Sequence, residues 1–384
     1  MIAIINARAV LPDKILSDAT VLIKDKKIYA VGQGISTERA QIIDAQGMYV
    51  GPGFVDIHIH GDGGANRWET DPEKVARHHL LHGSTTMVAT MSYGQTPQSL
   101  LQKTKNVQQK LDAGLLPNVC AVAFEGPFIN PKRGAKSSAF ARKGPDANEY
   151  IPLYEACRGK IAQWMYAPEM DKDGSFGDFL KEKGVTAAIG HTNASPLQIT
   201  QAVKKGATIA THLYDAMGCH MGDDSWQITG TAQDTAAVGC LISPELICEL
   251  ICDSRGIHVK PSNLKLVYQF AGADRIALVT DCTVCDYDPN DYPADHFRHT
   301  PDLNYNELEQ LSGSRLTMDR AVYNFAVHTG AGVTDLFKMA SATPAKAIGV
   351  YDSVGSVEVG KNADLVFLDD ALNLKKVIFR GKII

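Results

Sequence analysis

The sequence predicts an α/β fold, a (β/α)8 TIM-like barrel with a small β-sandwich domain formed by both termini. Three observations predict it. Short β-type segments occupy the two ends of the chain, and strand-like apolar runs alternate with helical patterns between them. The chain has 384 residues, which suits a barrel of about 250 residues with an accessory domain.

The terminal segments are short apolar runs punctuated by glycine and aspartate, the pattern of a small antiparallel sheet. They are Ile2–Ala7, Ala19–Ile23, Lys27–Val31 and Ala40–Ile43 at one end, and Asp364–Leu368 and Lys376–Gly381 at the other. Because these β-segments flank a long α/β region, we expect the two ends to pair into one sheet. The predicted domains are residues 1–52 with 350–384, and a barrel of residues 53–349.

The middle of the chain contains about eight apolar runs, each a candidate strand. They are Met48–Val50, Thr85–Thr90, Cys120–Phe124, Met165–Ala167, Thr186–Ile189, Thr208–Ala210, Leu246–Ile251 and Ile276–Thr280. Helical patterns such as Asp71–His82 and Pro196–Lys205 fall between them. Continuous apolar strands followed by helices are typical of a parallel sheet buried on both faces. About eight such units favour a closed barrel over an open sheet.

Composition excludes several classes of partner. The formal net charge is -5, and no run of lysines or arginines stands out, so we expect no binding to nucleic acid or to an anionic membrane surface. No stretch approaches the ~18 uninterrupted apolar residues of a membrane span. The N-terminal segment lacks a basic start and a long apolar core, so it is interpreted as a β-strand rather than a signal peptide. We therefore expect a cytoplasmic protein.

Several polar residues follow the apolar runs, at the end of a barrel where catalytic groups gather. The first are His58 and His60, in Asp56-Ile57-His58-Ile59-His60-Gly61. Residues i and i+2 of an extended strand face the same side, so both imidazoles can reach one metal ion. Neutral imidazole suits zinc and iron. Two incidental histidines on a strand face are the structural alternative.

Three further residues close separate strand-like runs. Glu125 follows the run that ends at Phe124, and His191 and His212 each follow another. An unpaired carboxylate at a barrel mouth would be costly, and a metal ion would offset that cost. An ion pair between Glu125 and a basic residue such as Arg133 is the alternative, and single histidines at strand ends are usually satisfied polar residues.

Asp281 closes the apolar run Ala277-Leu278-Val279-Thr280. An aspartate at this place can orient a water molecule and move its proton, although a helix N-cap is the structural alternative. The joint pattern decides between these interpretations. Six such residues end strands in order along the chain: a pair of histidines, a glutamate, two single histidines and an aspartate. This combination is far more specific than any one of its members.

With these motifs in view, the chain resembles the N-acetylglucosamine-6-phosphate deacetylases of the amidohydrolase superfamily over essentially its whole length. The resemblance is carried by Gly51–Gly61, Glu125–Phe128, Ala167–Glu169, Gly190–Thr192, Thr211–Tyr214, Val279–Asp281, Leu311–Ser314, Ala342–Ala345 and Gly360–Asp364. The last of these is shared with amidohydrolases in general. Glu-Gly-Pro, Gly-His and Thr-His-Leu-Tyr are more specific to the deacetylases.

The resemblance implies roles for individual residues. Glu125, His191 and His212 would hold the principal divalent metal, zinc or iron, and Asp281 would be the general acid and base. His58 and His60 could complete a binuclear site, so one or two ions are expected. The substrate site would include His258, Asp215, Ala216, Lys136, Leu311, Ser312 and Gly313. The family is commonly dimeric, so a homodimer is expected.

Two departures from the family concern the sugar phosphate. The family usually has Asn-Ala-Met where this chain has Asp215-Ala216-Met217, and an arginine-containing segment where this chain has Gly222–Gln227 with Asp223 and Asp224. Two carboxylates beside a phosphate would repel it. Many members also have His or Gln where Lys136 stands. The sequence therefore predicts phosphate recognition that differs from that of the typical deacetylase.

The expected function is metal-dependent hydrolysis of the acetamide of an N-acetylated amino sugar, N-acetylglucosamine 6-phosphate or a close relative, to acetate and the amino sugar. The expected partner is thus a small-molecule amino sugar. Two alternatives stay open. One is an amidohydrolase that acts on an unphosphorylated sugar or another N-acyl compound. The other is a metal-binding barrel that has lost catalysis and serves as a sensor, against which the presence of Asp281 argues.

Overall fold

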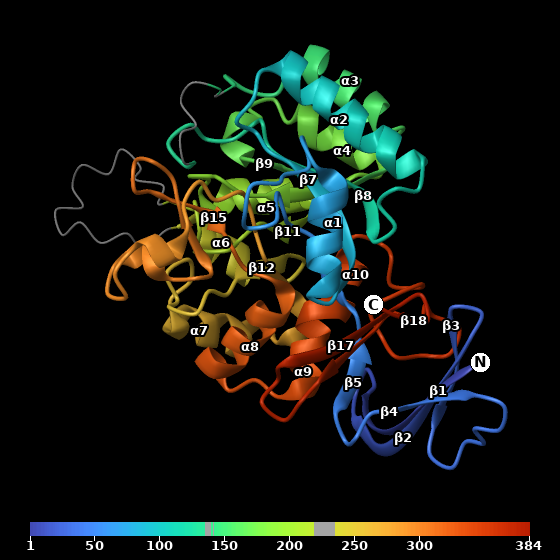
Figure 1. The fold of residues 1–384 in the computed structure, drawn as a ribbon. Helices are drawn as coiled ribbons and strands as arrows, with labels where there is room; N and C mark the ends of the chain where they lie inside the picture. The colour runs from blue at the N-terminus through green and yellow to red at the C-terminus, as the bar shows by residue number, and fades with distance from the viewer. Residues whose placement is uncertain (135–139, 141, 219–234) are drawn as a thin grey trace.

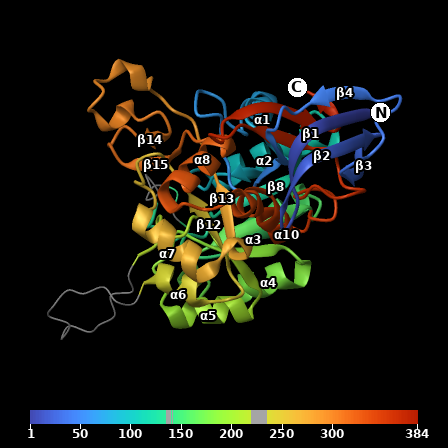
Figure 2. The same ribbon diagram turned by 90° about the horizontal axis from the view of Figure 1, so that it is seen from below.

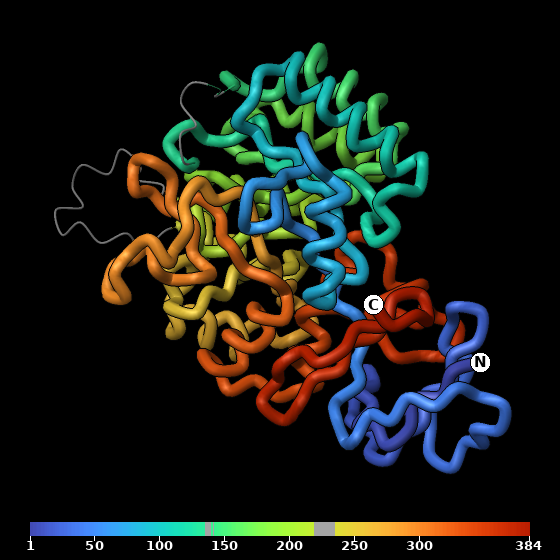
Figure 3. Tube along the Cα trace, in the orientation of Figure 1, coloured from blue at the N-terminus to red at the C-terminus, as the bar shows by residue number. Residues whose placement is uncertain are grey.

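The computed structural model describes residues 1–134, 140, 142–218 and 235–384. A barrel and a terminal sheet lie side by side, and both chain ends lie in the terminal sheet (Figures 1 and 3). None of the helices in the described ranges is long and apolar enough to cross a membrane.

Eight parallel strands form the barrel sheet, in the spatial order of the sequence. They are β6 (Phe54–Asp56), β7 (Ser84–Met91), β8 (Val119–Glu125), β9 (Ile161–Tyr166), β10 (Thr186–Ile189), β11 (Ala207–Ala210), β12 (Ile247–Ile251) and β13 (Ile276–Val279). Main-chain hydrogen bonds just beyond β6 and β13 join the first strand to the last: the Asp281 N–H donates to the His58 carbonyl at 2.9 Å, and the His60 N–H to the Cys282 carbonyl at 2.7 Å. The predicted (β/α)8 barrel is confirmed.

Helices surround this sheet (Figure 2). The α-helices are α1 (Pro72–Leu81), α2 (Pro97–Asp112), α3 (Ala147–Ala156), α4 (Ser175–Lys183), α5 (Pro196–Lys204), α6 (Ala236–Ile242), α7 (Pro261–Ala271), α8 (Met318–Thr329), α9 (Val333–Phe337) and α10 (Thr343–Ala347). Shorter turns are η2 (Pro168–Met170), η3 (Ala273–Arg275), η4 (Pro289–Asp291), η5 (Phe297–His299) and η6 (Lys338–Ala342). Local sequence fixes several starts: α5 begins with a capping box between Ser195 and Gln198 and a proline in its first turn, a strong N-terminal signal.

Side chains of the barrel strands alternate between two cores, because successive strand residues face opposite sides of a sheet. In β13, Ala277 and Val279 belong to the inner cluster with Met165 and Ile209, and Ile276 and Leu278 belong to the outer cluster against the helices. Every residue of β13 is buried. The apolar runs of the sequence therefore reflect strands that are covered on both faces.

Both ends of the chain contribute to the terminal sheet. Its strands are β1 (Ile2–Val10), β2 (Ile15–Lys24), β3 (Lys27–Gly32), β4 (Gln41–Asp44), β5 (Tyr49–Pro52), β16 (Leu365–Leu368), β17 (Leu374–Phe379) and β18 (Lys382–Ile383). The order is β18-β17-β16-β5-β1-β2-β3, with β4 also beside β1. Residues from β1 to β5, β16 and β17 share one apolar core, so the sheet curves around its own interior, as a sandwich does. In β16, Val366 and Leu368 face the barrel side instead.

Two expectations about these strands are wrong. Met48–Val50 was expected in the barrel, but β5 pairs with β1 and β16 of the terminal sheet, and the first barrel strand is the three-residue β6. The segment resembles a barrel strand because Val50 is fully buried, in the core of the terminal sheet. The terminal sheet is also mixed rather than antiparallel, since β4 and β5 both run parallel to β1.

A two-stranded hairpin of β14 (Leu303–Tyr305) and β15 (Leu311–Ser314) follows the barrel sheet. Ser314 forms an isolated bridge with Cys282, just past the end of β13. The Ser314 hydroxyl also donates to the Thr280 carbonyl at 2.5 Å. The hairpin is thereby fixed to the carboxyl end of the barrel, next to Asp281.

Candidate metal centre

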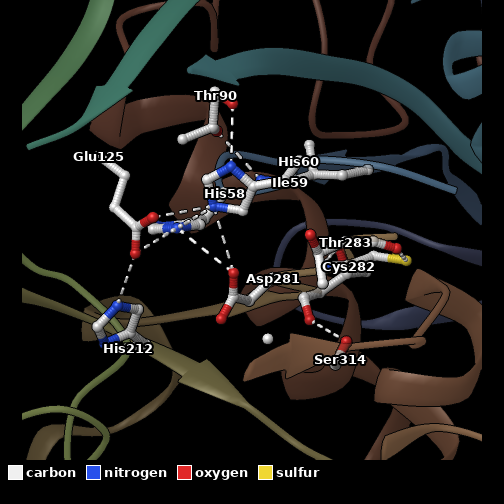
Figure 4. Close-up of polar contacts among 12 residues, drawn as sticks. His58, Ile59, His60, Thr90, Glu125, His212, Asp281, Cys282, Thr283 and Ser314 are labelled. Atoms are coloured by element: carbon white, nitrogen blue, oxygen red, sulfur yellow. Dashed lines mark hydrogen bonds and ion pairs between the residues drawn. The ribbon is translucent and has the colours of Figure 1, made fainter. Parts of the chain in front are cut away.

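Five side chains predicted as metal ligands meet at the carboxyl end of the barrel strands. They form two groups that share Glu125, one with His58 and His60 and one with His191 and His212; within each group the ligand atoms lie within 4.8 Å of one another. Figure 4 shows His58, His60, Glu125 and His212 turned toward one another, with Asp281 beside them. All five are buried.

Glu125, the last residue of β8, stands between the two groups. Its Oε1 lies 2.7 Å from His191 Nε2 and 3.4 Å from His212 Nε2. Its Oε2 lies 3.3 Å from His60 Nε2. Burial alone would raise the pKa of Glu125, but His191, His60 and His212 outweigh burial and hold the pKa well below its usual value. The carboxylate is therefore ionised and faces both groups, with His58 Nε2 also 3.7 Å from Oε1.

The orientation of each imidazole is set by its Nδ1 atom. His60 Nδ1 lies 3.0 Å from the Thr90 carbonyl and His212 Nδ1 lies 3.2 Å from the Asp215 carbonyl. His191 Nδ1 contacts the Arg133 carbonyl. A carbonyl oxygen can only accept a hydrogen bond, so each Nδ1 carries the proton. Nε2 of each ring is therefore the atom turned toward the centre, the arrangement that metal-bound histidines usually show.

The Nε2 atoms of the histidines lie close together in pairs. His58 Nε2 and His60 Nε2 are 3.3 Å apart, and His191 Nε2 and His212 Nε2 are 3.2 Å apart. Facing lone pairs repel unless a cation or a proton separates them. Burial lowers the pKa of His60, but the charges of Glu125 and Asp281 outweigh burial and raise the pKa to about 9. The donor set of imidazole and carboxylate fits a divalent transition metal.

Three of the functional residues adopt an uncommon backbone conformation. His191, His212 and Asp281 each lie two positions past the end of their strand and have positive φ angles of 45°, 29° and 47°. Non-glycine residues rarely occupy this region, and where they do the strain is often found at functional sites. The turn directs each side chain across the mouth of the barrel. His58 and His60 differ from expectation here, because they lie beyond β6 rather than within a strand.

Asp281 lies against the His58–His60 pair. Its Oδ1 is 3.4 Å from His60 Nε2 and 3.7 Å from His58 Nε2. Burial would raise the pKa of Asp281, but the hydrogen bond with His60 and the charges of His58 and His60 outweigh burial and lower it. Asp281 is therefore ionised at neutral pH, the form that a proton acceptor requires.

An open cleft of about 560 Å³ leads to these residues. Its wall includes Glu125, His191, His212 and Asp281, together with five of the residues expected to contact substrate: Asp215, Ala216, Leu311, Ser312 and Gly313. The structure also adds residues that the sequence did not indicate, chiefly Tyr93, Asn304 and Tyr305. Among the described residues of the cleft wall, the lysine and arginine side chains are those of Arg67, Lys132 and Arg133.

His258 lies behind this wall. It is 6% exposed, with Nδ1 3.2 Å from Asp253 Oδ2 and Nε2 3.2 Å from the Gly313 carbonyl. Both ring nitrogens thus face acceptors. Burial lowers the pKa of His258, but the bond to Asp253 and the nearby carboxylates outweigh burial and raise it. Through Gly313 the ring contacts the loop that lines the cleft, and its predicted role toward substrate stays a prediction.

Some predicted site residues lie outside the described ranges. Lys136 is one, and Asp223 and Asp224 of the segment Gly222–Gln227 are two more. Arg133 and Arg255 are described. Arg133 lines the cleft and its Nε contacts Asn193 Oδ1; the ion pair with Glu125 that the sequence left open does not form between these two described residues. Arg255 is exposed and donates to Thr300 at 3.1 Å.

Sequence reasoning assigned no role to two carboxylates that support the centre, half-buried Glu169 and fully buried Glu249. Glu169 accepts hydrogen bonds from Asn130, Thr192 and the Asn193 N–H, which ties together the loops that follow β8 and β10. Glu249, in β12, contacts His58. A charged residue inside an apolar strand, Ile-Cys-Glu-Leu-Ile, was the available signal for Glu249.

The fold is a (β/α)8 barrel with imidazoles and carboxylates clustered at its strand ends. An ionised aspartate lies beside them in an open cleft. These features together define a metal-dependent hydrolase. Comparison with known proteins narrows this class. Residues 179–384 match the model of the amidohydrolase family. The N-acetylglucosamine-6-phosphate deacetylase of Lysinibacillus sphaericus is 30% identical over 373 residues, which cover 94% of this chain and 92% of that protein.

Solved structures agree with this assignment. The N-acetylglucosamine-6-phosphate deacetylase from Pasteurella multocida is 25% identical with a TM-score of 0.84, covering 100% of this chain and 99% of its own. A mutant of the Mycobacterium smegmatis deacetylase in complex with N-acetyl-D-glucosamine-6-phosphate is 26% identical with a TM-score of 0.83, covering 100% and 98%. The chain belongs to the amidohydrolase family and, within it, to the N-acetylglucosamine-6-phosphate deacetylases.

Proposed function

We propose that this enzyme hydrolyses the acetamide of an N-acetylated amino sugar, N-acetylglucosamine 6-phosphate or a close relative, to acetate and the amino sugar. One observation carries the proposal: Glu125 and four imidazoles converge at the floor of the cleft, with the ionised carboxylate of Asp281 3.4 Å from His60 Nε2. The amide carbon of a bound acetyl group can there meet a water molecule whose proton Asp281 accepts.

The chain's residues have distinct parts in this reaction. A divalent cation, when bound, would lower the pKa of water and polarise the acetyl carbonyl. Glu125, His191 and His212 would hold it. Asp281 would take the proton of the attacking water and then deliver a proton to the amide nitrogen as the C–N bond breaks. Addition of one water to the amide gives acetic acid and the amine, and transfer of the acid proton to the amine leaves acetate and the protonated amino sugar.

We infer a site for zinc or iron, because imidazole and carboxylate donors suit both. The two groups around Glu125 support binding of up to two ions, since Glu125 is a member of both. Metal analysis of the purified enzyme, after dialysis against each cation in turn, tests both identity and number. A preparation that retains no divalent cation and gains no activity on adding one would contradict the proposal.

Recognition of the sugar would come from the cleft wall. Leu311, Ser312 and Gly313 form one side of it and Asp215 and Ala216 another. Lys132 and Arg133 are the described cations nearest in sequence to Glu125, and Arg67 follows His60. These three side chains are the described candidates for contact with a phosphate.

Acetate release from phosphorylated and free N-acetyl amino sugars, measured with defined metals, tests the activity directly. We expect release from at least one N-acetyl hexosamine and none from the free amino sugar that lacks the acetyl group. Failure to release acetate from any member of the panel would refute the proposal. The homodimer and the cytoplasmic location that the sequence predicts stay predictions.

A further inference from the structure

Glu249 is a buried carboxylate beneath the metal centre. It lies in β12 and has no solvent exposure. Removing a charge from water is costly unless the charge is paired and hydrogen-bonded. Glu249 is separate from the five predicted ligands and from Asp281, so the proposed reaction leaves its charge without a role.

The contacts of Glu249 lead directly to a predicted ligand. Its Oε2 lies 3.2 Å from His58 Nδ1 and 3.4 Å from the main-chain nitrogen of His212. Its Oε1 accepts a hydrogen bond of 2.9 Å from Gln163 Nε2, which also donates to the Ile57 carbonyl at 2.6 Å. Glu249 is thus held from both sides and presents one oxygen to the ring of His58.

This contact distinguishes His58 from the other three imidazoles. The Nδ1 atoms of His60, His191 and His212 each face a main-chain carbonyl, whereas that of His58 faces a carboxylate. A charged acceptor forms a stronger hydrogen bond than a neutral one. A carboxylate on the outer nitrogen of a metal-bound imidazole fixes its tautomer and makes the inner nitrogen a stronger donor.

We propose that Glu249 is a positioning residue that holds His58 with its proton on Nδ1 and strengthens the binding of a divalent cation at the His58–His60–Glu125 group. The proposal rests on the proposed function, because it assumes that this group binds a metal ion. The group that contains His191 and His212 depends on Glu249 only through the main chain of His212, so its affinity changes less.

The decisive experiment compares the wild type with Glu249→Gln, which keeps the shape of the side chain and removes its charge. Metal-free protein is titrated with Co²⁺ alone, and occupancy is followed by the visible absorption of the ion and by equilibrium dialysis. We expect the weaker of two binding steps to lose about 10- to 100-fold in affinity and the stronger step to stay within about threefold.

Gln163→Met is the matched control, because it also removes a buried polar group that contacts Glu249 but leaves His58 untouched. Both variants are expected to unfold more easily than the wild type. Only Glu249→Gln is expected to weaken the second Co²⁺ step and alter its spectrum. Equal loss of affinity in the two variants would show that Glu249 supports only the fold and would overturn the proposal.

Histidine resonances provide a readout that survives a poorly folding variant. In wild-type enzyme loaded with Zn²⁺ and labelled with ¹⁵N-histidine, we expect the His58 ring N–H on Nδ1, and farther downfield than those of His60, His191 and His212. A His58 signal that matches the other three would overturn the proposal. If the wild type binds neither Co²⁺ nor Zn²⁺, the proposed function itself is contradicted. If the wild type binds two ions and Glu249→Gln binds both with the same affinities as the wild type, only the proposed role of Glu249 is contradicted.

Discussion

The main-chain N–H of Asp281 donates a hydrogen bond of 2.9 Å to the carbonyl of His58. This bond joins the second residue after the last barrel strand to the second residue after the first. It brings the carboxylate of Asp281 to within 3.4 Å of His60 Nε2. The hydrogen bond that closes the barrel therefore also places Asp281 beside the histidines of the candidate metal centre.

Asp281→Asn should keep the fold and the metal but lose most turnover. The amide preserves the shape of the side chain and cannot accept the proton, a step typically worth roughly 10²–10⁴-fold in rate. We expect that loss in kcat at unchanged metal content. Asp286→Asn, an identical change in the wall of the same cleft, is the control and should lose far less. Near-normal kcat in Asp281→Asn would show that another residue is the base.

Removing ligands should reveal how the ions share Glu125. His60→Ala should bind one ion fewer than the wild type under metal-replete conditions, because its group loses one of three donors. Glu125→Gln should weaken both binding steps, because Glu125 is a member of both groups. Inductively coupled plasma mass spectrometry of the dialysed proteins measures both. Equal stoichiometry in the wild type, His58→Ala and His60→Ala would refute a second site.

Phosphate specificity should be weaker than the family name suggests. The segment Gly222–Gln227 carries Asp223 and Asp224 where an arginine is usual in the family, and only Arg67, Lys132 and Arg133 provide cations in the described wall of the cleft. We expect a kcat/KM ratio for phosphorylated over free N-acetylglucosamine below about 10³. A larger ratio would require ~4 kcal/mol or more of phosphate-specific binding and would contradict the expectation. Lys132→Met measures how much of the ratio that side chain supplies.

His79 should make the fold sensitive to acid. Its Nε2 lies 2.8 Å from the Gly61 carbonyl, and its buried Nδ1 has no partner among the described residues. Burial, aided by the charge of His78, lowers the pKa of His79 to about 3. The ordinary pKa of histidine in an unfolded chain is about 6.5. At pH values between about 6.5 and about 3, the unfolded chain therefore binds a proton at His79 that the folded chain does not. Stability is thus full above this window and declines as the pH falls through it.

His79→Gln removes this proton linkage and can still donate to Gly61. The free energy of unfolding in urea, measured from pH 7 to pH 4.5, should fall more steeply for the wild type than for the variant. The difference in slope should reach up to about 1.4 kcal/mol per pH unit. Parallel pH profiles would mean that His79 is protonated in the folded protein or contributes nothing to the acid response.

The site could be predicted from sequence because its residues sit at strand ends. Glu125, His191, His212 and Asp281 each follow an apolar run, and parallel strands bring such positions to one end of a barrel. The same reasoning failed for Glu249. Its partners His58 and Gln163 are 191 and 86 positions away in the chain, and a single polar residue within a strand says nothing about which distant residue it meets.

The pairing of the strands could not be predicted from the sequence either. Both β5 and the true first barrel strand, β6, are short and contain buried residues, and only Gly53 separates them. Hydrophobicity cannot tell which sheet such a strand joins. The residues of the cleft wall could not all be predicted from the sequence. Asn304 and Tyr305 come from a hairpin whose position depends on the bridge between Ser314 and Cys282. The division at residues 52/53 and 349/350 stays a prediction.

The terminal sheet also governs when the protein can finish folding during its synthesis. β5 is paired on one side with β1 and on the other with β16, which is translated more than three hundred residues later. At roughly 5–20 residues per second, the first strands wait on the order of 15–60 s on the ribosome with an edge unpaired. An open strand edge is a template for pairing with other chains. The nascent chain is thus exposed to aggregation until the last strands emerge, and chaperone protection of its N-terminal strands would matter most in that interval.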